Sequence, residues 1–131
     1  MFTLEAIKAA HAKVKSGADF PKYIQELKTL GLKNYSVYVN DGHTDYESID
    51  SNIINAPAKY AELTIAQQTN AEQFKHQLKV HQQGGTDYPT FCKDCADAGI
   101  EKWIVDLPTM TCTYYDTTGR NILVENIPQP E

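Results

Sequence analysis

Two cysteines spaced as C-x-x-C are the first candidates for chemistry in this chain. Cys92 and Cys95 lie in the stretch TDYPTFCKDCADAGIEKW, residues 86–103. Such a pair can bind a metal ion or exchange a disulfide. It can also pack into a core, because free cysteine behaves as a small hydrophobic residue. Residues three apart on a helix face the same side, so the two side chains are expected to share one environment.

A structural zinc site would need four ligands, and the chain offers Cys92, Cys95, Cys112 and either His81 or His76. A single C-x-x-C is half of the usual double signature. A redox role is opposed by position, because Cys92 lies about five residues beyond Asp87, past the part of the helix that lowers a thiol pKa most. We predict no metal and no cofactor, and keep zinc binding and thiol chemistry as alternatives.

A histidine close to carboxylates is the second candidate. In VNDGHTDYE, residues 39–47, His43 and Asp45 would share one face of a strand, so that a carboxylate can orient an imidazole for general-base catalysis. The competing interpretation is a hydrated hairpin in which Asp41-Gly42 makes the turn. We favour the hairpin, since no nucleophile motif lies nearby, and predict no catalytic residue.

Aromatic residues on the expected strands give a better indication of function. They are Tyr35, Tyr38, Tyr46, Trp103, Tyr114 and Tyr115. Most should pack within the sheet and core, but tyrosine and tryptophan are also enriched in ligand grooves and protein contacts. The candidate residues for binding a ligand or partner are Tyr35, Tyr46, Trp103, Tyr114 and His43.

The elements that must position these residues occur twice. Residues 17–32, GADFPKYIQELKTLGL, align without a gap with residues 85–100, GTDYPTFCKDCADAGI, which lie 68 positions later. The shared Asp-aromatic-Pro start is typical of a helix N-terminus, and the shared Gly-aliphatic end is typical of a helix stop. The offset places the two cysteines of the C-x-x-C on Ile24 and Leu27. Core packing is therefore the favoured interpretation of both thiols.

Each half is expected to hold two helices and a three-stranded meander. Apolar residues at helical spacing and the start and stop signals predict helices over residues 3–16, 19–30, 71–83 and 87–98. Runs rich in β-branched and aromatic residues predict strands over residues 33–40, 43–48, 53–54, 101–106, 111–116 and 122–124.

The predicted fold class is α+β, with an internally duplicated helix-helix-three-strand unit, a pseudo-twofold axis, and an antiparallel sheet backed by helices. The strands should form one sheet or two facing sheets, because a single meander with two helices buries too little surface. A length of 131 residues predicts one domain. Its first half covers residues 1–56. The connector covers residues 57–69, and the second half covers residues 70–131.

Composition excludes several classes of protein. Twelve basic and seventeen acidic residues give a net charge of -5, so nucleic-acid binding is not expected. Charged residues interrupt MFTLEAIKAAHAKVKSGADF, which favours neither a signal peptide nor a membrane span. We expect a cytoplasmic protein with reduced thiols and no membrane or nucleic-acid partner. A monomer or a homodimer is expected.

The quoted segments also carry a resemblance that covers nearly the whole chain. The opening MFTLEAIKAAHAKVKSGADFPKYIQELKTLG, the middle NDGHTDYES and APAKY, and the run TDYPTFCKDCADAGIEKWIVDLPTMTCTYYDTTGRNILVENIP resemble the small bacterial, often prophage-borne YdfO-like proteins. These are often described as phage envelope proteins and form a family of unknown function. The resemblance implies an α+β fold and a bacterial or phage origin. It implies no established activity and supplies no functional residues.

The function expected from the sequence is that of a soluble, non-enzymatic binding or interaction module that uses a groove or sheet face near the pseudo-twofold. Its partner would be a protein or a small molecule. The alternative is a thiol-based enzyme or sensor, or a structural zinc protein, that uses Cys92 and Cys95.

Overall fold

The computed structural model describes residues 3–14 and 19–127. In this part of the chain two helices and three strands are followed by two further helices and three further strands. The helices are α1 (Leu4–His11), α2 (Phe20–Thr29), α3 (Ala71–Gln82) and α4 (Tyr88–Asp97). The strands are β1 (Leu32–Tyr38), β2 (Thr44–Ser48), β3 (Ile53–Ala56), β4 (Ile100–Asp106), β5 (Thr111–Asp116) and β6 (Asn121–Asn126).

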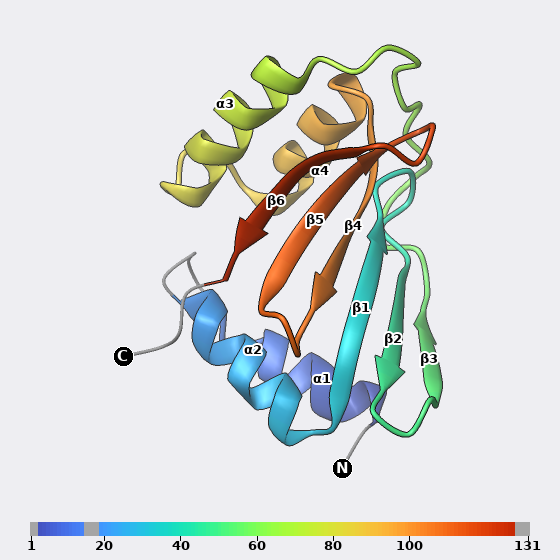
Figure 1. Ribbon diagram of the computed structural model, residues 1–131, viewed down its shortest axis with the longest axis vertical. Coiled ribbons are helices and arrows are strands. Elements are labelled where there is room, and N and C mark those ends of the chain that lie inside the picture. The colour runs from blue at the N-terminus through green and yellow to red at the C-terminus, as the bar shows by residue number, and fades with distance from the viewer. Residues whose placement is uncertain (1–2, 15–18, 128–131) are drawn as a thin grey trace.

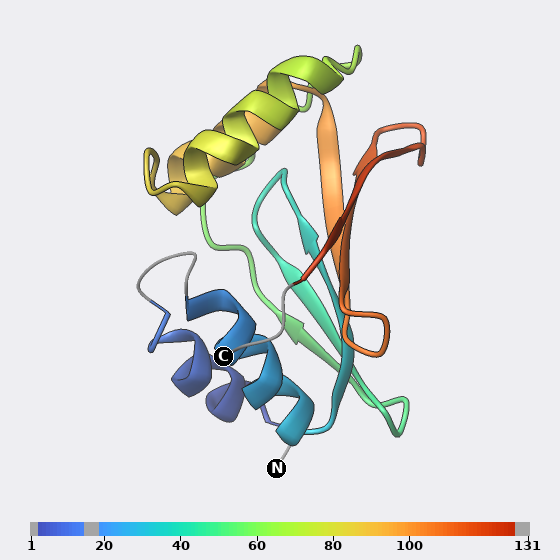
Figure 2. The ribbon, with the colours of Figure 1, turned by 60° about the vertical axis from the view of Figure 1, so that its left-hand side comes forward.

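All six strands form one antiparallel sheet in the order β3-β2-β1-β4-β5-β6. The four helices lie on one face of this sheet, with α1 and α2 toward one end and α3 and α4 toward the other (Figures 1 and 2). This confirms the predicted α+β class and selects one sheet over two. The other face, which carries Ser36, Tyr38, Asp45, Lys102 and Ile104, has no helix against it in the described residues and is called the uncovered face below.

The pairing of the strands follows the 68-residue offset of the sequence. At the centre of the sheet Ser36 of β1 pairs with Ile104 of β4, which stands 68 positions later. Tyr35 pairs with Tyr46 in the first half, and Trp103 pairs with Tyr114 in the second. The two halves therefore present equivalent positions at opposite ends of the sheet. Their origin by duplication stays a prediction.

Helices α2, α3 and α4 begin and end within one residue of the bounds that the sequence patterns predict. Asp87 caps α4 by accepting a hydrogen bond from the Thr90 amide at 2.9 Å. Gly31 and Gly99 end α2 and α4 with φ of 93° and 85°, the left-handed backbone that glycine adopts without penalty. The first helix ends earlier than expected, at His11, and residues 15–18 of the predicted 3–16 helix and the loop after it lie outside the described residues.

The core lies between the helices and the sheet. Cys92 and Cys95 are 0% exposed on the sheet-facing side of α4, as are Ile24 and Leu27 on α2. The prediction that the C-x-x-C is core packing is confirmed. Within residues 3–14 and 19–127, none of the helices has the length and apolarity that crossing a bilayer requires.

Candidate functional site

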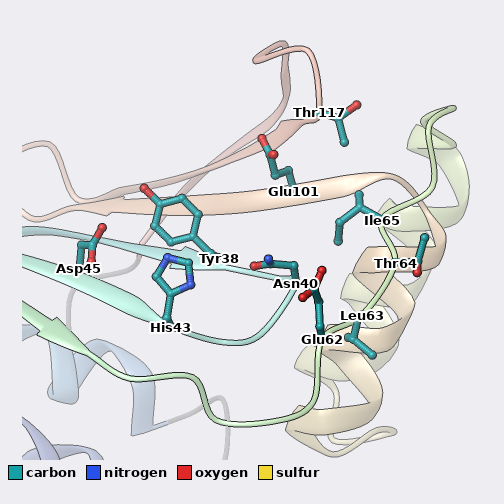
Figure 3. A pocket seen from close by; sticks show the side chains of 10 residues that line it. All are labelled: Tyr38, Asn40, His43, Asp45, Glu62, Leu63, Thr64, Ile65, Glu101 and Thr117. Carbon is teal, nitrogen blue, oxygen red and sulfur yellow. The ribbon is translucent and has the colours of Figure 1, made fainter.

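A groove opens at one end of the uncovered face, where the connector between β3 and α3 passes the ends of β1, β2 and β4. It has a volume of about 590 Å³. Its lining comes from β1, the β1–β2 turn, β2, β4, the connector and the β5–β6 turn (Figure 3). The lining residues are Tyr38, Asn40, His43, Asp45, Glu62, Leu63, Thr64, Ile65, Glu101 and Thr117.

The β1–β2 hairpin holds an imidazole beside this groove. Gly42 has a φ of 77°, and its amide donates to the Tyr38 carbonyl at 2.8 Å, which closes the turn that Asp41-Gly42 predicts. Oδ1 of Asp41 accepts the His43 amide at 2.9 Å and contacts Nδ1 of His43 at 2.5 Å. These bonds, the backbone one first, lower the pKa of Asp41, so an ionised carboxylate receives the Nδ1 proton.

The sequence allows His43 to pair with Asp45, the interpretation that was not favoured, and the structure pairs the imidazole with Asp41 in the hairpin turn. Asp45 accepts a hydrogen bond from the Asn55 amide group at 2.6 Å, on the neighbouring edge strand. Asp41 is nearer because it lies in the tight turn, where its side chain folds back on the residue two positions on, a common geometry for aspartate in turns.

A row of stacked side chains crosses the uncovered face next to the groove. The rings of Tyr38 and His43 stack at 4.2 Å with an interplanar angle of 5°. Nζ of Lys102 lies 5.8 Å from the Tyr38 ring centre and 5.6 Å from that of Tyr115. Since Lys102 pairs with Tyr38 across β1 and β4, and with Tyr115 across β4 and β5, these contacts follow from the strand register.

The connector forms a fixed wall of the groove. Its Lys59 amide donates to the Asp41 carbonyl at 2.8 Å, and its Leu63 amide donates to the Asn40 carbonyl at 2.6 Å. The Tyr60 hydroxyl donates to the Val39 carbonyl at 2.6 Å. At its far end the Ala66 amide donates to the α4 carbonyl of Ala96 at 2.9 Å. Backbone bonds at both ends therefore hold the segment that carries Glu62, Leu63, Thr64 and Ile65.

The β5–β6 turn, which brings Thr117 to the groove, is organised by Asp116. This buried carboxylate accepts the amides of Thr118 at 2.9 Å and Arg120 at 3.0 Å. It also accepts the hydroxyl of Thr69 at 3.2 Å, which ties the turn to the connector. The bonds from Thr118 and Arg120 hold the pKa of Asp116 well below its usual range. Two walls of the groove are thus linked through one ionised side chain.

Two carboxylates of the groove have no protein partner in the described part of the chain. The side chains of Glu62 and Glu101 make no hydrogen bond or ion pair there, unlike Asp41, Asp45 and Asp116. In Figure 3 Glu62 rises from the connector and Glu101 from β4, with Ile65 and Asn40 between them, and Asp45 lies farther along beside His43. The groove therefore presents free acceptors next to aliphatic surface.

The residues that the sequence suggested for binding are divided between two environments. Four of them, Tyr35, Tyr46, Trp103 and Tyr114, point toward the helices and are buried in the core. His43 alone among the five lines the groove. The alternation of strand side chains explains this division, because successive residues point to opposite faces of the sheet. The four aromatic residues lie at positions that face the core, whereas Tyr38 and Tyr115 lie at positions that face the other side.

The thiols are placed where they are poorly reactive. Cys92, Cys95 and Cys112 are free and buried, and burial raises the pKa of each, to about 12 for Cys112. Nδ1 of His81 lies 3.1 Å from the carbonyl and hydroxyl oxygens of Thr86, and its ring stacks on Phe91. Across residues 3–14 and 19–127, no three histidine, cysteine, aspartate or glutamate residues are grouped to hold a metal ion. The four residues of the zinc alternative are not assembled into a site.

Sequence reasoning missed most of the groove. Tyr38 was recognised as a strand aromatic, and its parity relative to Tyr35 would have placed it on the opposite face. The connector residues carry no periodic signal, and their position depends on hydrogen bonds to the hairpin and to α4. Glu101 was read as the start of a strand, and nothing local marks it as facing a groove.

The fold and groove together define a small α+β protein with a helix-backed antiparallel sheet and a polar groove at one end of its uncovered face. Residues 8–126 match the family described as "Protein of unknown function (DUF1398)". This match spans most of the chain, and the chain belongs to that family. A comparison with curated proteins gave no match.

Proposed function

We propose that this protein is a non-enzymatic binding module and that the groove is its binding site for a small molecule. The observation that carries the proposal is the groove itself, about 590 Å³ in volume, with two aliphatic side chains and several polar groups converging on one space. Pockets that take small molecules have volumes in this range and combine apolar walls with a few placed polar groups.

The construction of the site supports binding by a preformed surface. The hairpin, the connector and the β5–β6 turn are each fixed by hydrogen bonds to neighbouring segments. A site whose walls are already ordered loses less conformational entropy when a ligand enters. The carboxylates of Glu62 and Glu101, which make no hydrogen bond or ion pair with the described residues, supply polar groups that a ligand can satisfy.

The alternative based on thiol chemistry has less support. Reactive cysteines are partly exposed and have lowered pKa values, whereas Cys92 and Cys95 are fully buried and have raised ones. A ligand in the groove would meet neither thiol, because neither lines it.

A pair of tryptophan substitutions on the connector tests the proposal. Thr64→Trp places a large side chain in the groove, while Gln67→Trp places the same side chain on an exposed connector position outside the lining. A library of small polar molecules is screened by thermal shift, and hits are checked by native mass spectrometry. We expect hits that stabilise the wild type and Gln67→Trp but fail to stabilise Thr64→Trp. Hits that stabilise all three proteins equally, or a screen without hits, would refute the groove as the binding site.

We further propose that the protein is most similar in sequence to the YdfO-like, prophage-associated members of its family, and that residues 1–131 form one domain. We also propose that it acts in the cytoplasm as a monomer or homodimer. The FCKDCA and GIEKW segments support the first of these assignments, and the shared core of the two halves supports the single domain. Cell fractionation and light scattering test the location and the oligomeric state.

A further inference from the structure

The charges around the groove are strongly biased toward one sign. Asp45, Glu62 and Glu101 contribute three carboxylates, and none of the ten lining residues is a lysine or arginine. Two cations lie nearby: Lys102 has its Nζ over the rings of Tyr38 and Tyr115, and Arg120 is paired with Asp116. Charge complementarity therefore favours a cationic occupant.

We propose, on the basis that the groove is the binding site, that its ligand is an aliphatic amine with one or more primary or secondary ammonium groups. Such an amine is positively charged near neutral pH, as the lysine side chain is. Its N–H groups donate to the carboxylates of Glu62 and Glu101, and its methylene groups pack against Leu63 and Ile65.

The ring contacts distinguish this ligand from a quaternary ammonium ion. Recognition of quaternary ammonium groups depends on open aromatic faces. Tyr38 is the aromatic residue of the lining besides His43, and its ring is stacked on His43 at 4.2 Å, with the Lys102 ammonium 5.8 Å from the same ring. The Tyr38 ring therefore already has an aromatic and a cationic neighbour. The carboxylate oxygens of the lining can accept hydrogen bonds, which a primary or secondary ammonium group donates and a quaternary ammonium ion cannot.

The carboxylates are suited to accept such donors. Asp45 shares its Oδ1 with Asn55, and Asp41 is engaged by His43. Glu62 and Glu101 have no partner in the described residues, and they come from two different segments, the connector and β4. Glu62 is exposed and Glu101 half-buried, so solvent screens both charges, and we expect each residue to contribute a moderate part of the affinity.

Four ligands of matched chain length test the class. Diaminobutane carries two primary ammonium groups. Its N-methylated counterpart, in which both groups are quaternary trimethylammonium groups, carries the same charge without N–H donors. Butanediol is neutral, and succinate is anionic. Binding of each is measured at low ionic strength by isothermal titration calorimetry and by thermal shift. We expect diaminobutane to bind, the N-methylated compound and butanediol to bind at least about tenfold more weakly, and succinate not to bind.

Three charge-neutralising variants locate the interaction. Glu62→Gln and Glu101→Gln each remove one charge from the groove. Glu47→Gln removes one charge from β2 at a position outside the lining. We expect each groove variant to weaken diaminobutane binding by roughly tenfold and Glu47→Gln to bind as the wild type does.

The outcomes separate this inference from the proposed function. Binding of butanediol or succinate that Thr64→Trp abolishes would keep the groove as a site and overturn the amine. Equal binding of the N-methylated compound, or diaminobutane affinities unchanged in Glu62→Gln and Glu101→Gln, would also overturn it. If no small molecule distinguishes Thr64→Trp from Gln67→Trp, the proposed function fails together with the inference.

Discussion

The two ends of the uncovered face are built from equivalent strand positions and carry different chemistry. Positions that line the groove at one end of the sheet are replaced at the other end by residues of different charge or size. Tyr38 corresponds to Asp106, His43 to Thr111, Asp45 to Thr113, Glu101 to Lys33, and Thr117 to Ile49. The connector at residues 57–69 follows β3, the last strand of the first half, whereas β6, the last strand of the second half, is followed within the described residues by Ile127 alone.

This difference teaches that the repeated scaffold alone does not make the groove. Both hairpins offer a rim at the end of the sheet, and both β2 and β5 start beside a buried side chain, Thr44 or Cys112. The groove appears where the connector adds a wall and where Asp45 and Glu101 replace Thr113 and Lys33. Comparing equivalent positions therefore separates what the scaffold requires from what the site requires.

Truncation of equivalent helix positions should produce the largest difference between the halves. Leu27 on α2 and Cys95 on α4 are both 0% exposed and correspond to each other. Leu27→Ala should lower the free energy of unfolding by about 4 kcal/mol, because a fully buried leucine leaves a cavity. Cys95→Ala should lower it by about 1 kcal/mol, because one small apolar group is lost. Urea unfolding of the two variants measures both losses of unfolding free energy. Equal losses would contradict the expectation, because they would show that the two positions are not packed alike.

A pair of glycine substitutions should reveal the contribution of the connector. Gly31 and Gly99 have similar positive φ angles, but a Cβ on Gly31 would meet nothing within 4 Å, whereas one on Gly99 would lie 2.9 Å from the Gln68 carbonyl oxygen and from Thr69 Cα. Gly31→Ala should cost about 1 kcal/mol of unfolding free energy from backbone strain. Gly99→Ala should cost about 3 kcal/mol, because a backbone clash is added.

Thermal and urea unfolding of both glycine variants provide the check. If the amine proposal holds, Gly99→Ala should also weaken diaminobutane binding more than Gly31→Ala, because it displaces the wall that carries Glu62. Identical stabilities for the two variants would mean that the connector adapts freely and is not a fixed wall.

Much of the fold could be predicted because local signals and the repeat agree. Asp87, Pro89 and Gly99 mark the ends of a helix that the structure places at Tyr88–Asp97. The position of Cys92 and Cys95 opposite Ile24 and Leu27 correctly indicated burial. Such features depend on nearby residues and on periodicity, which a single sequence carries.

The candidate site could be predicted in part only, since it depends on contacts between distant segments. His43 was found because a histidine beside a turn is conspicuous in sequence. Glu62 and Ile65 reach the groove because the connector bonds to Asn40 and Ala96, residues far from them along the chain. The four core aromatics were selected by residue type, which does not tell which face of a sheet a side chain occupies.

The smallest expected difference between the halves concerns pH and the turns after β2 and β5. Ser48 and Asp116 are equivalent and buried, and each accepts amide hydrogen bonds from residues two and four positions on. Only Asp116 can titrate. Because its folded-state pKa is depressed, its contribution to stability is fully present above the unfolded value of about 3.9 and is lost as pH falls below that value toward the folded pKa.

Asp116→Asn should therefore flatten the acid side of the stability profile, while Ser48→Ala should lower stability by a similar amount at every pH. Asp41 and Asp87 also have lowered pKa values, but they remain in all three proteins and their effects cancel in the comparison. The measurement is the urea midpoint of each protein between neutral and strongly acidic pH. Parallel profiles for the wild type and Asp116→Asn would show that the charge of Asp116 does not stabilise its turn. The two turns would then be equivalent in energetics as well as in position.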